Sequence, residues 1–311
     1  GIRKVGLIVD PDADVLRRHV GDGTQFGLDV GWAVQDEAKG IAHALLAAED
    51  LVADQPFLVY LGDALYGDCI TNFVEQFAAS YPAGLVRLAA VDDPRQYGVA
   101  TLNGDSMITK LVEKPKDPPS NLAITGLYGF PPNFYDAIRE TTPSARGELE
   151  ITDAISNFLS NPYGVCGETY EGFWADAGQP HHLLDASRSM LDAIKQPVSA
   201  GALIETDVIG SLSVGEGSVL ERCQVRGPVL VGRDCRITNS TIGPHVSIGD
   251  GCVIESTAVR DSILDQDATL CDVNAELEQC IVGIGSRVCH VANGAGPLST
   301  VVGDGAILQT I

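Results

Sequence analysis

Residues 231–249 read VGRDCRITNSTIGPHVSIG, and three times in this stretch an aliphatic residue is followed directly by glycine. The pair recurs through the rest of the tail, at Val214-Gly215, Val282-Gly283 and Val302-Gly303. Units of about six residues are typical of a β-helix with three short strands per turn, whose coils bury their aliphatic side chains against one another. A β-sandwich would instead alternate at period two, with a turn about every 8 to 12 residues. We therefore predict a left-handed parallel β-helix over residues 198–311, with about five coils of about 18 residues.

Upstream of the repeats, apolar segments alternate between strand and helix patterns. Strands are predicted at Lys4–Val9, Leu28–Val34, Pro56–Leu61, Gly84–Val91, Ile108–Val112 and Leu122–Phe130, and helices at Asp14–Val20, Gly40–Val52, Asn72–Ala79 and Glu148–Leu159. This alternation predicts a Rossmann-like open α/β sheet over residues 1–197, mostly parallel, with helices on both faces. Lys4–Val9 has the composition of a fully buried central strand. Ligands of such sheets bind beyond the carboxyl ends of the strands.

Two predicted helices are amphipathic. The helix at Gly40–Val52 places Ile41, Leu45, Ala48 and Leu51 on one face. The helix at Pro180–Lys195 places Leu183, Ala186, Met190 and Ile194 on one stripe and ends before Pro197. We expect this second helix to link the two domains.

Charge and hydropathy exclude several classes of partner. The formal net charge is −22 and the pI is near 4.4, without a cluster of Lys and Arg, so neither nucleic acid nor an acidic membrane surface is an expected partner. No apolar run approaches the length of a bilayer-spanning helix, and the first ten residues do not resemble a secretory signal. Six of the eight cysteines lie after residue 220 as small apolar residues of the repeats, and none forms a C-x-x-C pair. We expect a reduced cytoplasmic protein without a disulfide scaffold.

Four motifs carry residues suited to phosphate and metal chemistry. They are Leu58–Asp63 (LVYLGD), Val112–Pro119 (VEKPKDPP), Arg146–Asp153 (RGELEITD) and Phe173–Gly178 (FWADAG). Asp63 and Asp176 end strand-like segments, Lys114 lies between Glu113 and a proline, and Arg146 could bind a phosphate through two nitrogens. Two carboxylates with one Lys and one Arg at one sheet edge suit Mg²⁺ and substrate phosphates. The alternative is that each aspartate caps a neighbouring helix.

These motifs carry a family resemblance that runs over nearly the whole chain. Specific stretches are VEKP at 112–115, PPSNLA at 118–123, TGLY at 125–128 and RGELEITD at 146–153, together with Gln35 followed by Gly40-Ile41-Ala42. The sequence resembles the sugar-1-phosphate nucleotidyltransferases, and among them the longer form of glucose-1-phosphate thymidylyltransferase. The resemblance implies Mg²⁺-dependent transfer from dTTP, or UTP, to glucose 1-phosphate, giving dTDP-glucose and pyrophosphate.

The resemblance also implies roles for individual residues. Gln35 would bond the pyrimidine edge and the Gly40 backbone would lie against the base. Asp63 and Asp176 would bind Mg²⁺. The remaining residues would contact the sugar 1-phosphate: the backbone of Gly98, with Glu113, Thr125 and Tyr128, at the sugar, and Lys114 and Arg146 at its phosphate.

Two departures from the family pattern leave alternatives open. The chain lacks the Gly-rich loop, ending in Thr-Arg, with which the family begins, and it has Ala64 where the family tends to have Asn. We expect about 30 or more further residues upstream, one βαβ unit, whose loop would wrap the triphosphate and whose absence leaves catalysis by this chain open. One alternative is a non-catalytic or regulatory homologue that binds nucleotide sugar. Another is a bifunctional nucleotidyl/acetyltransferase, which needs a longer solenoid and a catalytic histidine; the tail offers only His245 and His290. We favour a structural tail that packs subunits into a homo-oligomer.

Overall fold

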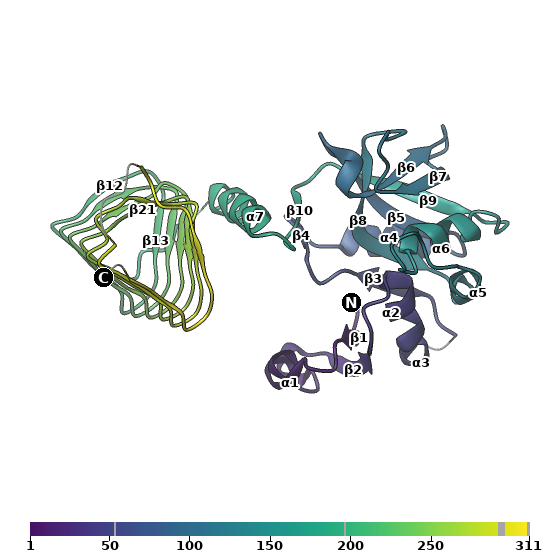
Figure 1. The fold of residues 1–311 in the computed structure, drawn as a ribbon, viewed down its shortest axis with the longest axis horizontal. Coiled ribbons are helices and arrows are strands. Elements are labelled where there is room, and N and C mark those ends of the chain that lie inside the picture. Colours follow the sequence, from purple (N-terminus) through teal and green to yellow (C-terminus); the bar gives the residue numbers. More distant parts are fainter. Residues whose placement is uncertain (53, 196, 292–295, 310–311) are drawn as a thin grey trace. The chain divides into compact units, whose positions relative to one another are not determined.

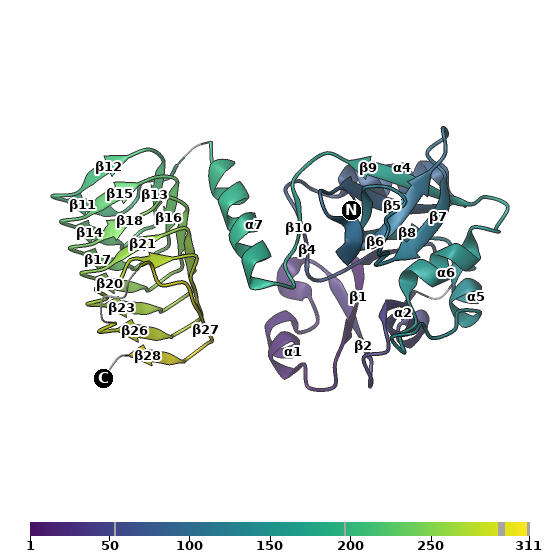
Figure 2. The same ribbon diagram turned by 45° about the horizontal axis from the view of Figure 1, so that its top comes forward.

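The computed structural model divides the chain into two compact units, Gly1–Gly172 and Phe173–Ile311 (Figures 1 and 2). It describes residues 1–52, 54–195, 197–291 and 296–309. Helix α7 (Pro180–Asp192) belongs to the second unit. The sequence places this helix in the first domain, before a boundary at residue 197, and that domain boundary stays a prediction. None of the helices in the described ranges has the length and apolar character needed to cross a bilayer.

The first unit is built around a six-stranded mixed sheet. Its strands are β3 (Phe57–Tyr60), β5 (Gly84–Ala90), β6 (Gly98–Leu102), β7 (Ile108–Glu113), β8 (Leu122–Phe130) and β9 (Val165–Tyr170). The prediction of a mostly parallel sheet is wrong for the neighbouring pairs, since only β5 and β9 pair in parallel. Strand β8 runs antiparallel to its neighbours β3, β5 and β6, and β6 pairs antiparallel with β7, which follows it after a short turn.

Helices cover both faces of this sheet, as predicted. Successive residues of a strand point to opposite faces, and Leu85 and Val86 of β5 belong to different core clusters. The Leu85 face packs against Phe73 and Phe77 of α4 (Thr71–Ser80). The opposite face packs against α2 (Ile41–Ala47), α5 (Phe134–Arg139) and α6 (Ile151–Phe158). Eight of the nine residues of β8 are buried, which explains its nearly continuous apolar composition.

Two predicted elements of this unit need correction. Strand β1 (Lys4–Val9) forms a two-stranded parallel sheet with β2 (Asp29–Val34), and only Val9 is buried. Within the described residues β1 therefore has one neighbour, and helix α1 (Asp14–Val20) buries none of its residues. The predicted helix at 40–52 is broken at Ala48 into α2 and α3 (Glu49–Val52), and Leu51 is exposed. The remaining short elements are η1 (Thr24–Phe26), β4 (Ala64–Tyr66), η2 (Pro94–Gln96) and β10 (Trp174–Asp176).

The second unit contains the predicted parallel β-helix, consistent with the left-handed form (Figure 2). Its strands form three parallel sheets: β11 (Ala202–Ile204), β14 (Val219–Glu221), β17 (Arg236–Thr238), β20 (Val253–Glu255), β23 (Thr269–Cys271), β26 (Arg287–Cys289) and β28 (Ile307–Gln309); β12 (Asp207–Ile209), β15 (Gln224–Arg226), β18 (Thr241–Ile242), β21 (Ala258–Arg260) and β24 (Leu277–Glu278); and β13 (Leu212–Val214), β16 (Val229–Val231), β19 (Val246–Ile248), β22 (Ser262–Leu264), β25 (Ile281–Val282) and β27 (Val301–Val302). Val219 pairs with Arg236 and Arg236 with Val253, so these coils repeat every 17 residues. Within the described residues the sheet containing β13 has six strands, so the prediction of about five coils is one too few.

Stacked aliphatic side chains form the core of the β-helix. Leu220, Ile237, Ile254, Leu270 and Val288 occupy the same position on successive coils, and each is 0% exposed. Each coil therefore buries the residues of its neighbours, which is why a six-residue pattern suffices to specify the fold.

Of the predicted apolar stripe, helix α7 buries Ala186 but leaves Leu183 and Met190 exposed. Met190 is 65% exposed, whereas Leu184, Ala186 and Leu191 are buried. The helix packs on β19 and β22, and the Arg188 guanidinium forms an ion pair with Asp261.

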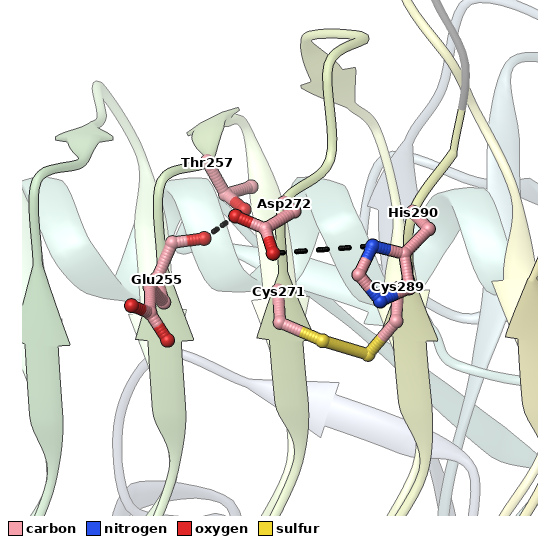
Figure 3. The surroundings of a disulfide bond; sticks show 6 residues. All are labelled: Glu255, Thr257, Cys271, Asp272, Cys289 and His290. Carbon is pink, nitrogen blue, oxygen red and sulfur yellow. Dashed lines mark hydrogen bonds and ion pairs between the residues drawn. A yellow bond between two sulfur atoms is a disulfide. The ribbon is translucent and has the colours of Figure 1, made fainter.

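One disulfide joins neighbouring coils of the β-helix, which corrects the expectation of a chain without disulfides. Cys271 and Cys289 are partners in the register of β23 and β26, with Cα atoms 4.7 Å apart (Figure 3). The next residues along the two strands are Asp272 and His290, and the Asp272 Oδ2 atom lies 3.9 Å from His290 Nδ1 beside the disulfide. Cys223, Cys235, Cys252 and Cys280 are buried free thiols, the filler role predicted for the cysteines of the tail.

Candidate functional site

A cavity of about 670 Å³ in the first unit brings together five of the predicted site residues: Gln35, Gly40, Glu113, Lys114 and Arg146. They come from segments far apart in the sequence, namely the end of β2, the start of α2, the end of β7 and the loop before α6. The cavity also receives the end of β3 through Leu61 and Gly62. The site therefore lies where strands end, the position that the fold class predicts.

A hydrogen bond orients the Gln35 amide at the wall of the cavity. Its Nε2 donates to the Gly40 carbonyl at 3.1 Å and lies 3.0 Å from Nδ1 of His43. Because a carbonyl can only accept, the amide nitrogen must face Gly40, and His43 Nδ1 must then be the acceptor of the second bond. The Gln35 Oε1 is left as the polar atom with which this side chain can meet a ligand.

The backbone of Gly40 lies against the loop that carries Arg146. Gly40 has φ of 97°, and a Cβ there would lie 2.5 Å from the carbonyl oxygen of Leu149. The Leu149 N–H donates to the Lys39 carbonyl at 2.7 Å, which ties the two segments together. A side chain at position 40 would push these segments apart, so glycine is required here.

Glu113 ends β7 as a largely buried carboxylate. Its side chain is 22% exposed, and its Oε2 accepts a hydrogen bond from the Thr152 hydroxyl at 3.1 Å. Burial raises the pKa of Glu113, and the nearby charge of Glu150 raises it further. Gly98 faces Glu113 in the register of β6 and β7, and a Cβ at Gly98 would lie 2.6 Å from the Thr152 methyl group. The absence of a side chain at position 98 makes room for the Glu113–Thr152 pair.

The two predicted phosphate-binding cations have different settings. Lys114 is exposed and adopts φ of 40°, a conformation that non-glycine residues rarely take, with its N–H bonded to the Tyr97 carbonyl at 3.0 Å. Arg146 lies among carboxylates: its Nε and Nη2 donate to Glu150 at 3.1 and 2.8 Å, and Nη2 lies 3.4 Å from both Glu113 and Glu148. The hydrogen bonds to Glu150 raise the pKa of Arg146, so the guanidinium is a fixed positive charge.

The two residues predicted for the sugar pocket, Thr125 and Tyr128, lie in the core of β8 and do not line the cavity. Thr125 is 1% exposed, and its hydroxyl donates to the Arg87 carbonyl at 2.9 Å and accepts from Tyr66. Tyr128 is 2% exposed, and burial is the main reason that its pKa is raised, with Glu113 and Asp63 contributing as nearby charges. Their contact with a sugar stays a prediction.

The two predicted metal ligands belong to different compact units, so their convergence on one ion stays a prediction. Asp63 is exposed and is followed by strand β4, and Asp176 accepts a hydrogen bond from the Gly178 N–H at 2.9 Å. Neither caps a helix, since the N-cap of α7 is Gln179, so the alternative interpretation of both aspartates is wrong. Carboxylate oxygens are the donors that Mg²⁺ prefers. Across the described ranges, no cluster of three or more His, Cys, Asp and Glu side chains suited to a metal is present.

Comparison with known proteins identifies the family of this chain. Residues 1–193 match the family model described as nucleotidyl transferase. The chain belongs to this family. A glucose-1-phosphate thymidylyltransferase of Streptomyces antibioticus is 35% identical over 98% of this chain and 85% of its own length, and one of Streptomyces griseus is 36% identical over 91% and 79%. A crystal structure from Bacillus anthracis, titled as a glucose-1-phosphate thymidylyltransferase in complex with sucrose, is similar with a TM-score of 0.55 and 35% identity, covering 62% of this chain and 77% of that one.

In this nucleotidyl transferase the structure adds three residues to the predicted site: His43, Glu150 and Thr152. Each contacts a predicted residue rather than standing in a motif of its own. Glu150 and Thr152 lie inside the RGELEITD stretch, but their partners are set by the fold. The only signal in the sequence was the high charge density of that stretch.

Proposed function

We propose that this chain transfers a nucleotidyl group from dTTP, or UTP, to glucose 1-phosphate and releases pyrophosphate. The observation that carries the proposal is the single cavity lined by Gln35, Glu113, Lys114 and Arg146. It offers an amide for a base, a carboxylate for sugar hydroxyls and two cations for a phosphate. The names of the two Streptomyces relatives support glucose 1-phosphate as the acceptor. The product would be a nucleotide-activated sugar of the kind used in deoxysugar biosynthesis.

The proposed chemistry is an in-line displacement at the α-phosphorus of the nucleotide. A phosphate oxygen of glucose 1-phosphate forms the new P–O bond, the bond to the β-phosphate breaks, and pyrophosphate leaves with the electron pair. The attacking oxygen is already ionised at neutral pH, so the reaction needs no protein nucleophile. Lys114 and Arg146 would hold the sugar phosphate in line, and Glu113 would accept hydrogen bonds from sugar hydroxyls.

The family resemblance implies a divalent cation, and the aspartate side chains fit one. Asp63 and Asp176 would hold Mg²⁺, because their carboxylates are free of helix-capping roles and are oxygen donors. When bound, the ion supplies positive charge that neutralises the phosphates of the nucleotide. The chain itself has a formal net charge of −22, which makes such local positive charge necessary for binding a triphosphate.

We assign the tail, residues 198–311, a structural role in packing subunits together, and we expect a cytoplasmic homo-oligomer. Of the tail's two histidines, His245 lies 3.0 Å from Asp192 of α7 and His290 lies beside the disulfide. The His245 contact joins α7 to the β-helix within one unit, which supports a structural role for this histidine.

The test is a turnover assay of the purified protein. Incubation with dTTP, glucose 1-phosphate and MgCl₂ should release pyrophosphate and yield dTDP-glucose by mass spectrometry, with UTP assayed in parallel. Omission of glucose 1-phosphate is the matched control. Binding of dTDP-glucose without pyrophosphate release from either nucleotide would identify a non-catalytic homologue and overturn the proposal.

A further inference from the structure

Glu150 is a buried carboxylate to which the proposed function assigns no role. It is 6% exposed, lines the cavity, and receives the Arg146 guanidinium through Nε and Nη2 at distances of 2.8 to 3.1 Å. The Ser144 hydroxyl donates to the same carboxylate at 2.8 Å. A carboxylate is stable at this depth only when it is paired and hydrogen-bonded, and both conditions are met here.

The position of Glu150 in the chain argues against a purely local role. It is the N-cap residue of α6, yet its side chain makes no hydrogen bond to the free N–H groups of that helix. The carboxylate turns back to the loop and binds Arg146 and Ser144 instead. Its interactions thus serve the orientation of Arg146 rather than the stability of the helix terminus.

The geometry leaves one side of the guanidinium available. Arg146 uses Nε and Nη2 for its carboxylate partners, and Nη1 makes no hydrogen bond with any described residue. A two-point hydrogen-bonded pair fixes the plane of the guanidinium as well as its position. The remaining N–H groups on Nη1 therefore have a fixed direction when a ligand arrives.

We propose that Glu150 is a positioning residue: it holds Arg146 so that Nη1 meets the phosphate of the sugar 1-phosphate. The proposal rests on the proposed function and deepens its account of substrate binding. In the absence of Glu150, the guanidinium would be drawn to Glu113 and Glu148, each 3.4 Å away. Arg146 would then mask the carboxylate that is to receive the sugar hydroxyls.

A second consequence concerns the protonation of Glu113. Its pKa is raised by burial and by Glu150, while the Thr152 hydroxyl, Lys114 and Arg146 lower it. Removal of the Glu150 charge takes away a raising influence, and an Arg146 closer to Glu113 adds a lowering one. Both effects move the pKa of Glu113 downward, so the acid limb of the activity profile should shift to lower pH.

The experiment compares wild type with Glu150→Gln, Arg146→Lys and the double variant. Glu150→Gln should raise the KM for glucose 1-phosphate about tenfold, which corresponds to about 1.4 kcal/mol. The KM for dTTP should be unchanged, and the acid limb of the pH–activity profile should shift to lower pH. If Glu150 acts through Arg146, the double variant should have the KM of Arg146→Lys alone. Glu75→Gln, the same change on the exposed side of α4, is the control and should match wild type.

Several results would overturn the inference. These are a wild-type KM and pH profile in Glu150→Gln, a loss that follows melting temperature alone, or additive effects in the double variant. If Glu150→Gln does not fold, Ser144→Ala takes its place, because it removes one hydrogen bond to the Glu150 carboxylate. An unchanged KM for glucose 1-phosphate in Ser144→Ala would also overturn the inference. Failure of the proposed function can be distinguished from failure of this inference, because the wild-type protein would then release no pyrophosphate. Calorimetric binding of glucose 1-phosphate to wild type and Glu150→Gln would still test the positioning role.

Discussion

Replacement of Gly98 by alanine should damage the site through one added methyl group. The new Cβ would lie 2.6 Å from Cγ2 of Thr152, 2.9 Å from Cδ1 of Ile124 and 3.3 Å from Oε2 of Glu113. The backbone at Gly98 is not left-handed, so the change introduces steric conflict without conformational strain. Thr152 must move, and with it the hydroxyl that holds Glu113.

The expected magnitude follows from packing energetics. Overpacking of a close-packed site costs about 1–3 kcal/mol, and the loss of glycine freedom in the unfolded chain offsets about 0.4–1 kcal/mol. A net loss of about 1–2 kcal/mol should lower the melting temperature by about 2–8 °C for a unit of this size. Displacement of Glu113 should raise the KM for glucose 1-phosphate about tenfold, equivalent to about 1.4 kcal/mol.

The assay is thermal denaturation combined with pyrophosphate-release kinetics. Thr152→Ser removes the clashing methyl group and keeps the hydroxyl donor, so Gly98→Ala/Thr152→Ser should recover much of the lost stability and KM. Gly104→Ala is the matched control, because a Cβ at Gly104 would meet no atom within 4 Å. Wild-type stability and KM in Gly98→Ala, or no recovery in the double variant, would refute the steric account.

Three further predictions concern the cation, the metal ligands and the disulfide. Lys114→Ala should raise the KM for glucose 1-phosphate and lower kcat about tenfold or more, since a charge-assisted contact contributes about 1.5–3 kcal/mol; wild-type kinetics would contradict the assignment. Asp63→Asn and Asp176→Asn should each raise the Mg²⁺ concentration for half-maximal rate and leave the metal-free melting temperature unchanged, whereas an unaltered Mg²⁺ requirement would exclude them as ligands. Cys271→Ser should lower stability to the same degree as reduction of wild type, about 2–4 kcal/mol, and thiol titration of the denatured, non-reduced wild type should find six free thiols; eight would show that Cys271 and Cys289 are unpaired.

Prediction from the sequence was most accurate where the determining contacts are local or repeated. The β-helix could be recognised because every coil presents the same aliphatic position to its neighbours, as at Leu220, Ile237 and Ile254. Helix α1 and strand β8 were predicted with their observed bounds, Asp14–Val20 and Leu122–Phe130. Of the site, Gln35 and Gly40 came from the family resemblance alone, whereas Glu113, Lys114 and Arg146 also stood in motifs suited to phosphate chemistry.

The tertiary structure decided everything that depends on a partner distant in the sequence. The direction of β8 among its neighbours follows from sheet pairing, which an apolar run of nine residues does not encode. Cys271 and Cys289 meet because the coil between them places both at one register position, and a few residues more or less would separate them. Glu150 stands four residues from Arg146, but its pairing with the guanidinium arises because the loop folds back and leaves α6 uncapped by it. The sequence by itself thus determined which residue types are present at the site, whereas long-range packing determined which of them act on one another.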